Sequence, residues 1–515
     1  MMKFLNSKIS QETLPDNLTF YTNDSLPERV IQFGEGNFMR GFVDWMIHEL
    51  NKQGHFNGKV VVVQPRSQDK IPLFNKQDGL FTLILRGVEN GHVIERKEII
   101  SSISRGLKVT DEWAELMNLV TSEKIRFIFS NTTEAGLTYK KEPFLQDTPP
   151  NSFPGKLTAL LYHRFSFYGG SRDTGLVILP CELVEDNGNV LKELVLKIAN
   201  DWQLPMEFKE WIKEDNYFCN TLVDRIVTGY PKDEIEQYEK TLGYKDELLT
   251  VGEPYHLFAI DAPEHVQQEL PFDKVGLNVK WGKITPFRDV KVRLLNGPHT
   301  LMSAVCYLAG ANTVQEVMED KVLRQYIENG MFNEIYPTVA IEEREKEQFA
   351  HSVIERFLNP YNKHYLKDIA LSSVYKFNTR LIPSLKDYVN EKNTLPLSIT
   401  FALAGLIVYN RPVNILCNDT DLVGSREGEA YAIRDNEKVL KAFNNAWTIF
   451  DETKTNESAS RLVTDILTNK EIWGENLSVI PSLSVTVSNY VVNILENGMR
   501  DCVEKLVNNV APINN

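Results

Sequence analysis

Residues 28–41 read Glu28-Arg-Val-Ile-Gln-Phe-Gly34-Glu-Gly36-Asn-Phe-Met-Arg-Gly41. The apolar run 30–33 predicts a short β-strand, and apolar residues between positions 38 and 50 recur at helical spacing. A strand, a Gly-x-Gly turn and a helix are typical of the start of a dinucleotide-binding βαβ unit, in which the glycines let the backbone approach a pyrophosphate. Gly41 lies beyond position 39, where the usual third glycine is expected. A tight turn without any ligand is therefore the alternative.

The next apolar run, residues 59–63, predicts a strand of a parallel sheet that is buried on both faces. Its end reads Gln64-Pro65-Arg66, and the first acidic residue after it is Asp69. Enzymes that read the ribose 2′-hydroxyl of NAD usually carry Asp or Glu at this strand end. Because Arg66 could instead receive the 2′-phosphate of NADP, this strand leaves the choice between NAD and NADP open.

Further strands follow along the first half of the chain. Runs 81–85 and 92–100 flank the turn residues 87–91, which predicts a β-hairpin insertion. Segments 124–136 and 175–188 each read as a strand and then a polar turn, and Asn187-Gly188 opens an apolar helix. Since the carboxyl ends of parallel strands line the ligand crevice, Asn131 and Thr132 are expected near the nicotinamide. A simple turn with helix caps is the alternative.

The pattern changes near residue 280, which predicts two domains, 1–280 and 281–515. Alternating strands and helices over residues 28–235 indicate an α/β class. A β-rich segment, 255–283, connects the halves. Helices are then predicted at 300–309, 342–357, 397–409, 435–450 and 485–506, the last of them interrupted at Gly498.

The second half contains the stretch Lys291-Val-Arg-Leu-Leu-Asn296-Gly-Pro-His299. On a helix, steps of five and eight residues place Lys291, Asn296 and His299 on one face, broad enough to line a cleft. Pro298 predicts either a kink or a helix that begins there. A solvated polar helix face is the alternative reading.

Composition restricts the classes of partner. The 515 residues carry a net charge of −14, which argues against nucleic acid and anionic membranes. The five cysteines are scattered and form no C-x-x-C pair, which favours reduced thiols and gives no metal-ligand cluster. The beginning of the sequence has no apolar signal segment, and no apolar run reaches about 18 residues. We therefore expect a cytoplasmic protein, either a monomer or a dimer.

Several motifs in order resemble the mannitol dehydrogenase family of metal-independent, long-chain polyol dehydrogenases, over about residues 28–500. The family motifs are G-x-G-x-F-x-R at residues 34–40, Cys181-x5-Asn187-Gly188, Asp224-Arg225-Ile226 and Lys291-x4-Asn296-x2-His299. The match is best with a branch that reduces sugar acids, on the motifs Phe33-Gly-Glu-Gly-Asn-Phe38, Phe129-Ser-Asn-Thr-Thr-Glu-Ala-Gly136, Pro180-Cys-Glu-Leu183 and Val227-Thr-Gly-Tyr-Pro231. The resemblance implies an N-terminal Rossmann-like domain, a mostly helical C-terminal domain, an active site between them, and NAD(H) as cofactor.

The resemblance also implies roles for individual residues. Lys291 becomes the general acid/base, Asn187 and Asn296 an oxyanion hole, and His299 the group that orients the substrate. Substrate-binding residues are expected to be Arg288, Asp224, His364, Lys376 and Arg380. Cofactor-binding residues are expected to be Ile31, Phe33, Gly34, Gly36, Asn37, Phe38, Met39, Arg40, Asn131 and Thr132.

Arg288 departs from the family pattern, because mannitol-type members carry an acid three residues before the lysine. A cation at this position could hold a sugar carboxylate through two parallel hydrogen bonds. Lys376, His364 or Arg380 could supply that clamp instead, and a solvent-facing arginine is a third possibility. The resemblance favours the reduction of one hexuronate, a sugar acid. Three alternatives remain: the substrate is a different epimer of that hexuronate, the substrate is a neutral polyol, or the protein binds a nucleotide and has lost catalysis.

Overall fold

The computed structural model describes residues 2–9, 14–15, 17–23, 25–64, 70–145, 147–415 and 422–508. The chain divides into two compact units. Unit 1 comprises Met1–Gly87 and His92–Thr285, and unit 2 comprises Val88–Gly91 and Pro286–Asn515. No helix within the described ranges is long and apolar enough to cross a membrane.

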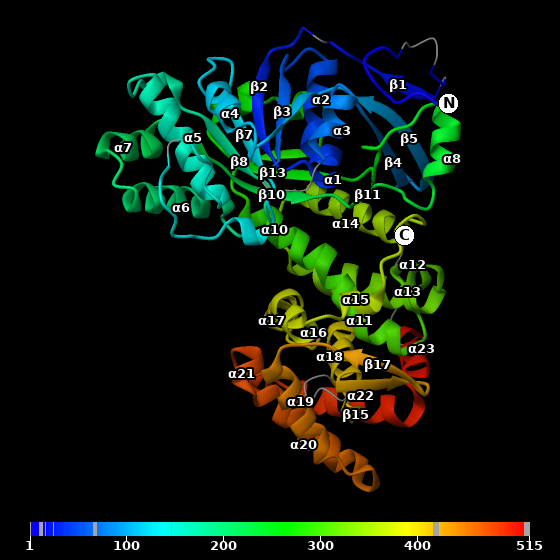
Figure 1. Ribbon diagram of the computed structural model, residues 1–515. Helices are drawn as coiled ribbons and strands as arrows, with labels where there is room; N and C mark the ends of the chain where they lie inside the picture. The colour runs from blue at the N-terminus through cyan, green and yellow to red at the C-terminus, as the bar shows by residue number, and fades with distance from the viewer. Residues whose placement is uncertain are drawn as a thin grey trace. The chain divides into compact units, whose positions relative to one another are not determined.

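In the described part of unit 1, the main sheet has six strands in the order β6-β3-β2-β7-β8-β9, and all neighbours run parallel (Figure 1). This is the strand order of a doubly wound dinucleotide-binding sheet, and the winding direction reverses between β2 and β7. The predicted α/β, Rossmann-like class is confirmed. The strands are β2 Glu28–Phe33, β3 Lys59–Gln64, β6 Ile103–Lys108, β7 Phe127–Ser130, β8 Val177–Pro180 and β9 Tyr217–Phe218.

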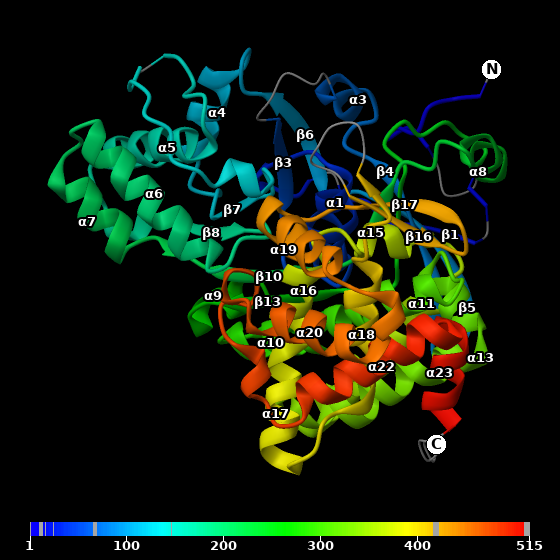
Figure 2. The same ribbon diagram turned by 90° about the horizontal axis from the view of Figure 1, so that it is seen from below.

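The two faces of this sheet bury alternate residues of each strand. Ile31 and Phe33 pack with one set of helices, whereas Val30 packs on the opposite face. Because successive side chains of a strand point to opposite faces, a sheet covered on both sides requires uninterrupted apolar runs such as that of β3. Helices α5, α6 and α7 lie together beside the sheet in Figures 1 and 2. The helices of the first face are α4 Trp113–Val120, α5 Phe153–Phe167, α6 Asn187–Asp201 and α7 Met206–Glu214, and those of the opposite face include α2 Trp45–Lys52 and α9 Glu264–Glu269.

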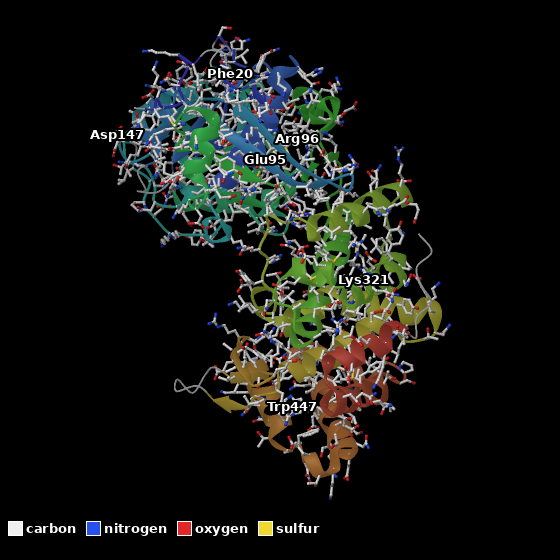
Figure 3. The ribbon with its side chains drawn as sticks, turned by 90° about the vertical axis from the view of Figure 1, so that its right-hand side faces the viewer. Phe20, Glu95, Arg96, Asp147, Lys321 and Trp447 are labelled. Carbon is white, nitrogen blue, oxygen red and sulfur yellow. The ribbon has the colours of Figure 1, made fainter. Side chains whose placement is uncertain are left out.

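The predicted β-hairpin insertion is part of a separate sheet, with the order β1-β5-β4-β12-β11. Its turn residues Asn90 and Gly91 have φ values of 52° and 75°. Asn-Gly is a preferred sequence for the two-residue turns whose twist matches a hairpin. Glu95 on β5, labelled in Figure 3, accepts a hydrogen bond from the Tyr238 hydroxyl of α8 at 3.1 Å. The elements are β1 Leu18–Phe20, β4 Phe81–Glu89, β5 His92–Ile100, β11 Val227–Gly229, β12 Thr250–Gly252, α3 Ile71–Lys76 and α8 Ile235–Leu242.

The segment predicted as a β-rich connection, 255–283, contains β13 (Leu257–Asp261), helix α9 and β14 (Val279–Trp281), and it belongs to unit 1. Its strands form a small sheet with β10 (Asn220–Asp224), in the order β10-β13-β14. Apolar runs alone do not show whether a segment connects two domains or closes one of them.

Unit 2 is mostly helical, as predicted. The run 485–506 forms two helices separated by Gly498, whose φ is 84°. The predicted helices correspond to α11 Gly297–Leu308, α14 Glu343–Phe357, α18 Leu397–Tyr409, α19 Glu437–Thr448, α22 Leu483–Asn497 and α23 Met499–Asn508. The others of four or more residues are α10 Thr285–Val290, α12 Val314–Glu319, α13 Lys321–Glu328, α15 Leu366–Ile369, α16 Ser373–Arg380, α17 Ile382–Lys392, α20 Thr455–Thr468 and α21 Lys470–Trp473, with π-helical turns η6 Lys291–Asn296 and η7 Asn329–Ile335.

Helix α18 lies at the centre of unit 2 and packs against both α11 and α22 (Figure 2). Its apolar sequence has no polar face, which is typical of a helix surrounded by protein. A small antiparallel sheet was not predicted in this half; it consists of β15 Asn414–Ile415, β16 Leu422–Arg426 and β17 Glu429–Ile433.

The N-terminus of α18 is capped by the side chain of a distant residue. Glu334, in η7, accepts hydrogen bonds from the backbone N–H groups of Ser398 (2.7 Å) and Ile399 (2.9 Å). Burial raises the pKa of the Glu334 carboxyl from its usual 4.5 to about 7. A folded-state pKa above the unfolded value means that the group stabilises the fold fully below about pH 4.5 and less as pH rises to 7.

The variant Glu334→Gln is therefore expected to lack part of the pH dependence of unfolding. Wild-type stability should fall relative to the variant between pH 5 and pH 8, by up to about 3 kcal/mol. Urea unfolding of both proteins across this range measures the difference. A constant difference from pH 5 to pH 8 would contradict the raised pKa.

Candidate active site

The glycine turn connects β2 to the first helical residues of unit 1. Gly34 has φ 119°, and an added Cβ would lie 2.8 Å from the backbone oxygen of Asn131. Only glycine fits this conformation and this close approach. An added Cβ at Gly36 would meet nothing within 4 Å, so the backbone is open there. The turn therefore has a buried glycine facing β7 and an open glycine that leaves space for a ligand.

The predicted cofactor residues around this turn divide into two kinds. Ile31, Phe33 and Met39 are buried core side chains, so only their backbone groups could contact a ligand. The buried guanidinium of Arg40 donates to the Thr250 hydroxyl (3.0 Å), the Glu35 carbonyl (2.6 Å) and the side chain of Asn37. Arg40 therefore stabilises the turn from within, and its predicted role in cofactor binding stays a prediction.

Phe38, the remaining predicted residue of the turn, is half-buried and stacks on Phe42 with 4.9 Å between ring centroids. Asn37 and Phe38 belong to the short helix α1, Asn37–Met39. The chain then passes through a π-helical turn, η2 Arg40–Asp44, into α2.

The carboxyl ends of β7 and β8 meet beside Gly34. The Asn131 backbone N–H donates to the Phe33 carbonyl (2.9 Å), and its side-chain amide donates to the Cys181 carbonyl (2.7 Å). The Thr132 N–H and hydroxyl both donate to the carboxylate of Glu182, at 2.9 and 3.0 Å. Glu182 was not among the predicted site residues, although the motif Pro180-Cys-Glu-Leu183 directly follows a strand and could have indicated it.

The end of β3 carries a polar side chain without a partner. Gln64 is almost fully buried, and neither its amide nitrogen nor its oxygen has a hydrogen-bond partner among the described residues. Buried amides are rarely left unpaired. Pro65, Arg66 and Asp69, which bear on the choice between NAD and NADP, lie outside the described residues. The open turn at Gly36 and the unpaired amide at a strand end fit a dinucleotide.

Asn187 has a fully engaged side chain in unit 1. Its amide nitrogen lies 3.0 Å from the carbonyls of both Pro180 and Glu182 and 3.1 Å from the Thr221 hydroxyl. Its oxygen accepts the N–H groups of Gly188 (2.9 Å) and Thr221 (2.8 Å). These bonds join β8, α6 and β10. For Asn187 to donate to a substrate oxygen, as predicted, one of them must be exchanged.

The motif Asp224-Arg225 lies at the end of β10. Asp224 is buried and pairs in register with Leu257. Arg225 donates to the carbonyls of Glu253 and Gly41, both at 2.8 Å, and lies 4.2 Å from the ring centroid of Trp45. The arginine ties β10 to the helical segment after the glycine turn. Substrate binding by Asp224 stays a prediction.

Lys291, Asn296 and His299 lie on one nearly continuous helical path in unit 2. Residues 285–290 are α-helical, Lys291–Asn296 form a π-helical turn, and α11 begins at Gly297 with Pro298 in its first turn. Neither predicted alternative for Pro298 was complete, because a wide turn precedes it. The i→i+5 bonding of a π-turn brings Lys291 and Asn296 onto one face, and such turns are frequent at functional sites.

His299 is buried among basic and aromatic side chains. Its ring centroid lies 4.7 Å from that of Phe357 and 4.8 Å from that of His364. Burial holds the pKa of His299 well below its usual range, and four basic residues lower it further: His364, Arg356, Arg380 and Lys376. The imidazole is therefore neutral and able both to donate and to accept a hydrogen bond.

Three of these basic residues were predicted, and Arg356 was not. Arg356 lies in the last turn of the charged helix α14, where no sequence pattern distinguishes it from its neighbours. Burial lowers the pKa of Arg380 to about 10, and the Arg380 guanidinium lies 3.4 Å from the Thr300 hydroxyl. Lys376 donates to the Ile369 carbonyl at 2.9 Å. We call Arg356, His364, Lys376 and Arg380 the basic group; it has the charge expected of an anion site.

Arg288 is half-buried on α10 and is not among the residues with the largest effect on the His299 pKa. It precedes Lys291 by one helical turn, as predicted. Two candidates for a carboxylate site therefore remain, Arg288 before the lysine and the basic group around His299.

One set of potential metal ligands, His48, Glu49 and Glu98, occurs in the described residues. The Lys52 ammonium lies between the two carboxylates, 3.0 Å from Glu49 and 2.6 Å from Glu98. The His48 Nδ1 atom accepts the Ser101 N–H at 3.1 Å. The arrangement is an ion-pair network whose cation is a lysine.

Comparison with known proteins gives consistent matches along the chain. A family model described as the mannitol dehydrogenase Rossmann domain matches residues 28–274, and one described as the mannitol dehydrogenase C-terminal domain matches residues 283–494. An altronate oxidoreductase of Halalkalibacterium halodurans is 46% identical over 495 residues, 96% of each chain. An altronate oxidoreductase of Bacillus subtilis is 42% identical over 480 residues, 93% of this chain and 95% of the relative.

Two solved structures share the fold. A D-sorbitol dehydrogenase in substrate-free form has a TM-score of 0.76 at 20% identity, covering 97% of this chain and all of that one. A Pseudomonas fluorescens mannitol 2-dehydrogenase, in a ternary complex with NAD and D-mannitol, has a TM-score of 0.67 at 20% identity, covering 98% of this chain and all of that one.

Proposed function

The chain belongs to the mannitol dehydrogenase family, and from this premise we propose that it catalyses the reversible, NAD-linked reduction of D-tagaturonate to D-altronate. The observation that carries the proposal is the basic group around the neutral His299, on a path that continues from Lys291 and Asn296. A neutral polyol needs no such charge, whereas a sugar carboxylate does. The relatives named altronate oxidoreductase, at 40–46% identity, support the same substrate.

The residues that hold the cofactor belong to unit 1. The open backbone at Gly36, the reversal of winding between β2 and β7, and the Gln64 amide, which has no hydrogen-bond partner among the described residues, fit a dinucleotide. When bound, NADH supplies a hydride for the carbonyl carbon of the keto acid.

We assign proton transfer to Lys291. As the carbonyl carbon is reduced, its oxygen becomes an alkoxide that needs a proton and hydrogen-bond donors. The Lys291 ammonium gives its proton to this oxygen and recovers it in the reverse direction. Asn296 donates to the same oxygen; its side chain is half-buried and makes no hydrogen bond with another described residue. Asn187, in unit 1, joins β8, α6 and β10.

Substrate orientation belongs to His299 and the basic group. A neutral imidazole donates to one substrate oxygen and accepts from a hydroxyl group, which a charged imidazolium could not do. The carboxylate of the sugar acid is bound by Arg380 and Lys376, and Arg356 adds positive charge beside them. We propose this site for the carboxylate in place of Arg288, which the sequence had favoured.

The substrate assignment is tested by following NADH oxidation with tagaturonate, fructuronate, fructose and no substrate. Tagaturonate should give the highest kcat/KM. A higher kcat/KM with fructuronate would make the protein a mannonate oxidoreductase. A higher value with fructose would make it a mannitol-type dehydrogenase and would remove the need for the basic group.

NADH is expected to give a higher kcat/KM than NADPH, with weaker discrimination than in an enzyme with Asp at the β3 end. With the cofactor bound, the Gln64 amide oxygen would be able to accept from a ribose hydroxyl, and a neutral amide would not repel a 2′-phosphate. Gln64→Glu should therefore increase the NADH preference several-fold, as measured by kcat/KM with each cofactor. A wild-type preference for NADPH would contradict the proposal.

A further inference from the structure

The turn after β7 contains a strained residue. Thr133 has φ 72° and ψ 165°, on the positive side of φ where a β-branched residue is an outlier. Such conformations persist only when the surrounding structure enforces them, and they are concentrated at functional sites. Thr133 itself is exposed, so its own side-chain packing does not impose the conformation.

The residue before it is held by a buried carboxylate. Glu182 Oε1 accepts from the Thr132 backbone N–H (2.9 Å) and from the Thr132 hydroxyl (3.0 Å). Glu182 Oε2 accepts from the Ser130 hydroxyl at 3.0 Å. Gly136 closes the turn, since an added Cβ there would lie 2.0 Å from the Thr132 hydroxyl oxygen. Thr132 is thus fixed on both its backbone and its side chain.

Stability alone does not account for a carboxylate at this position. Glu182 is almost fully buried, and burial raises the pKa of its carboxyl above the usual value. The groups that oppose this effect most are hydroxyl and backbone donors of Thr132 and Ser130 rather than a cation. A buried acid held only by neutral donors is unfavourable compared with an apolar residue. Its contribution is the geometry that it imposes on the turn.

The turn lies where a dinucleotide binds in a doubly wound sheet. β7 adjoins β2 at the point where the winding reverses. Asn131 starts the turn, and its backbone oxygen is the atom that an added Cβ at Gly34 would meet. The Thr132–Thr133 turn therefore follows directly from the residue that contacts the glycine turn, at the point where the winding reverses.

We propose that Glu182 is a positioning residue that holds the strained Thr132–Thr133 turn in the shape that receives the nicotinamide half of the cofactor. The proposal rests on the proposed NAD-linked function. Because both hydrogen-bond donors of Thr132, its backbone N–H and its hydroxyl, donate to Glu182, Thr132 acts through the shape of the turn rather than by direct donation to the cofactor.

The test compares two replacements of Glu182 by their dissociation constants for NADH, measured by quenching of protein fluorescence. Glu182→Met keeps the size of the side chain and removes every acceptor; it should raise the NADH Kd about tenfold. Glu182→Gln keeps one acceptor oxygen for Thr132 and should stay within about threefold of the wild type. Glu193→Met, an exposed glutamate on α6, is the matched control and should leave Kd unchanged.

A second substitution that restores NADH binding would show that Glu182→Met acts through the strained conformation of Thr133 and not through a general structural effect. Glycine adopts the Thr133 conformation without strain. Thr133→Gly should therefore recover at least half of the affinity lost in Glu182→Met, with the Kd of the single variant Thr133→Gly as the reference. A folded Glu182→Met with wild-type Kd, or a double variant without recovery, overturns the proposal.

If Glu182→Met does not fold, Thr132→Val and Thr132→Ser give the same information. Valine loses the hydroxyl bond to Glu182 and should raise Kd several-fold, whereas serine keeps the bond and should not; equal Kd values overturn the proposal. The wild-type titration tests the proposed function separately. Absence of NADH binding by the wild type refutes both, and wild-type binding with unaffected variants refutes only the role of Glu182.

Discussion

Replacing Lys291 with alanine is expected to lower kcat for keto-acid reduction by about a thousandfold or more. The change removes both the proton donor and a positive charge near the developing alkoxide. The Kd for NADH should change little, because the glycine turn and the ends of β3 and β7 belong to unit 1. Steady-state kinetics with saturating keto acid and a fluorescence titration with NADH measure the two effects.

Two further variants separate the proton from the charge. Lys291→Arg keeps a cation that does not give up its proton at neutral pH. Its kcat should therefore stay severely lowered, while its KM for the keto acid should be closer to the wild-type value than that of Lys291→Ala. Lys321→Ala removes an exposed lysine at the start of α13, labelled in Figure 3, and should behave like the wild type. Residual activity above about a tenth of the wild type in Lys291→Ala would contradict the assigned role.

The sequence allowed the main elements to be predicted where one local pattern dominates. The apolar run of β3 requires a doubly covered strand, and Gly34 must be glycine because both its φ and its distance from Asn131 exclude a side chain. Gly498 ends α22 by adopting φ 84°, which is also a local property. These features depend on a few neighbouring residues, so the sequence is sufficient to identify them.

The residues that were missed depend on distant parts of the chain. Thr132 and Glu182 are separated by 50 positions, and no periodicity connects them. Arg356 reaches the surroundings of His299 from a different helix, α14, so its role requires the fold. The π-turn before Pro298 is likewise invisible to a helical-spacing argument, which assumes 3.6 residues per turn.

For Asn187 the local structure was predicted correctly, whereas the predicted role of its side chain was incomplete. The sequence correctly predicted that it begins a helix, and the resemblance implied a catalytic amide. In the structure its oxygen and nitrogen are engaged by Gly188, Thr221, Pro180 and Glu182. The residue type identifies which hydrogen bonds a side chain is able to make. The packing determines which of its donors and acceptors are already engaged within the protein.

Removing the charge of Arg380 from the proposed carboxylate site is expected to have the second large effect, on KM rather than on kcat. Arg380→Met keeps the length of the aliphatic stem and removes the charge; it should raise KM for tagaturonate about a hundredfold, as expected for loss of a charge-assisted hydrogen bond in a partly buried site. The kinetics with fructose should change little, because a neutral ketose has no carboxylate. Steady-state kinetics with both substrates give the ratio directly.

The corresponding change at the other candidate, Arg288→Met, distinguishes the two sites. Arg380 is expected to dominate because burial lowers its pKa to about 10 and because it lies with Lys376 and Arg356 around one neutral imidazole, so the positive charge there favours an anion. Arg288 lies on α10, one turn before Lys291. If Arg288→Met raises KM for tagaturonate and Arg380→Met does not, the carboxylate binds beside the proton donor, and the charge around His299 serves only to keep that imidazole neutral.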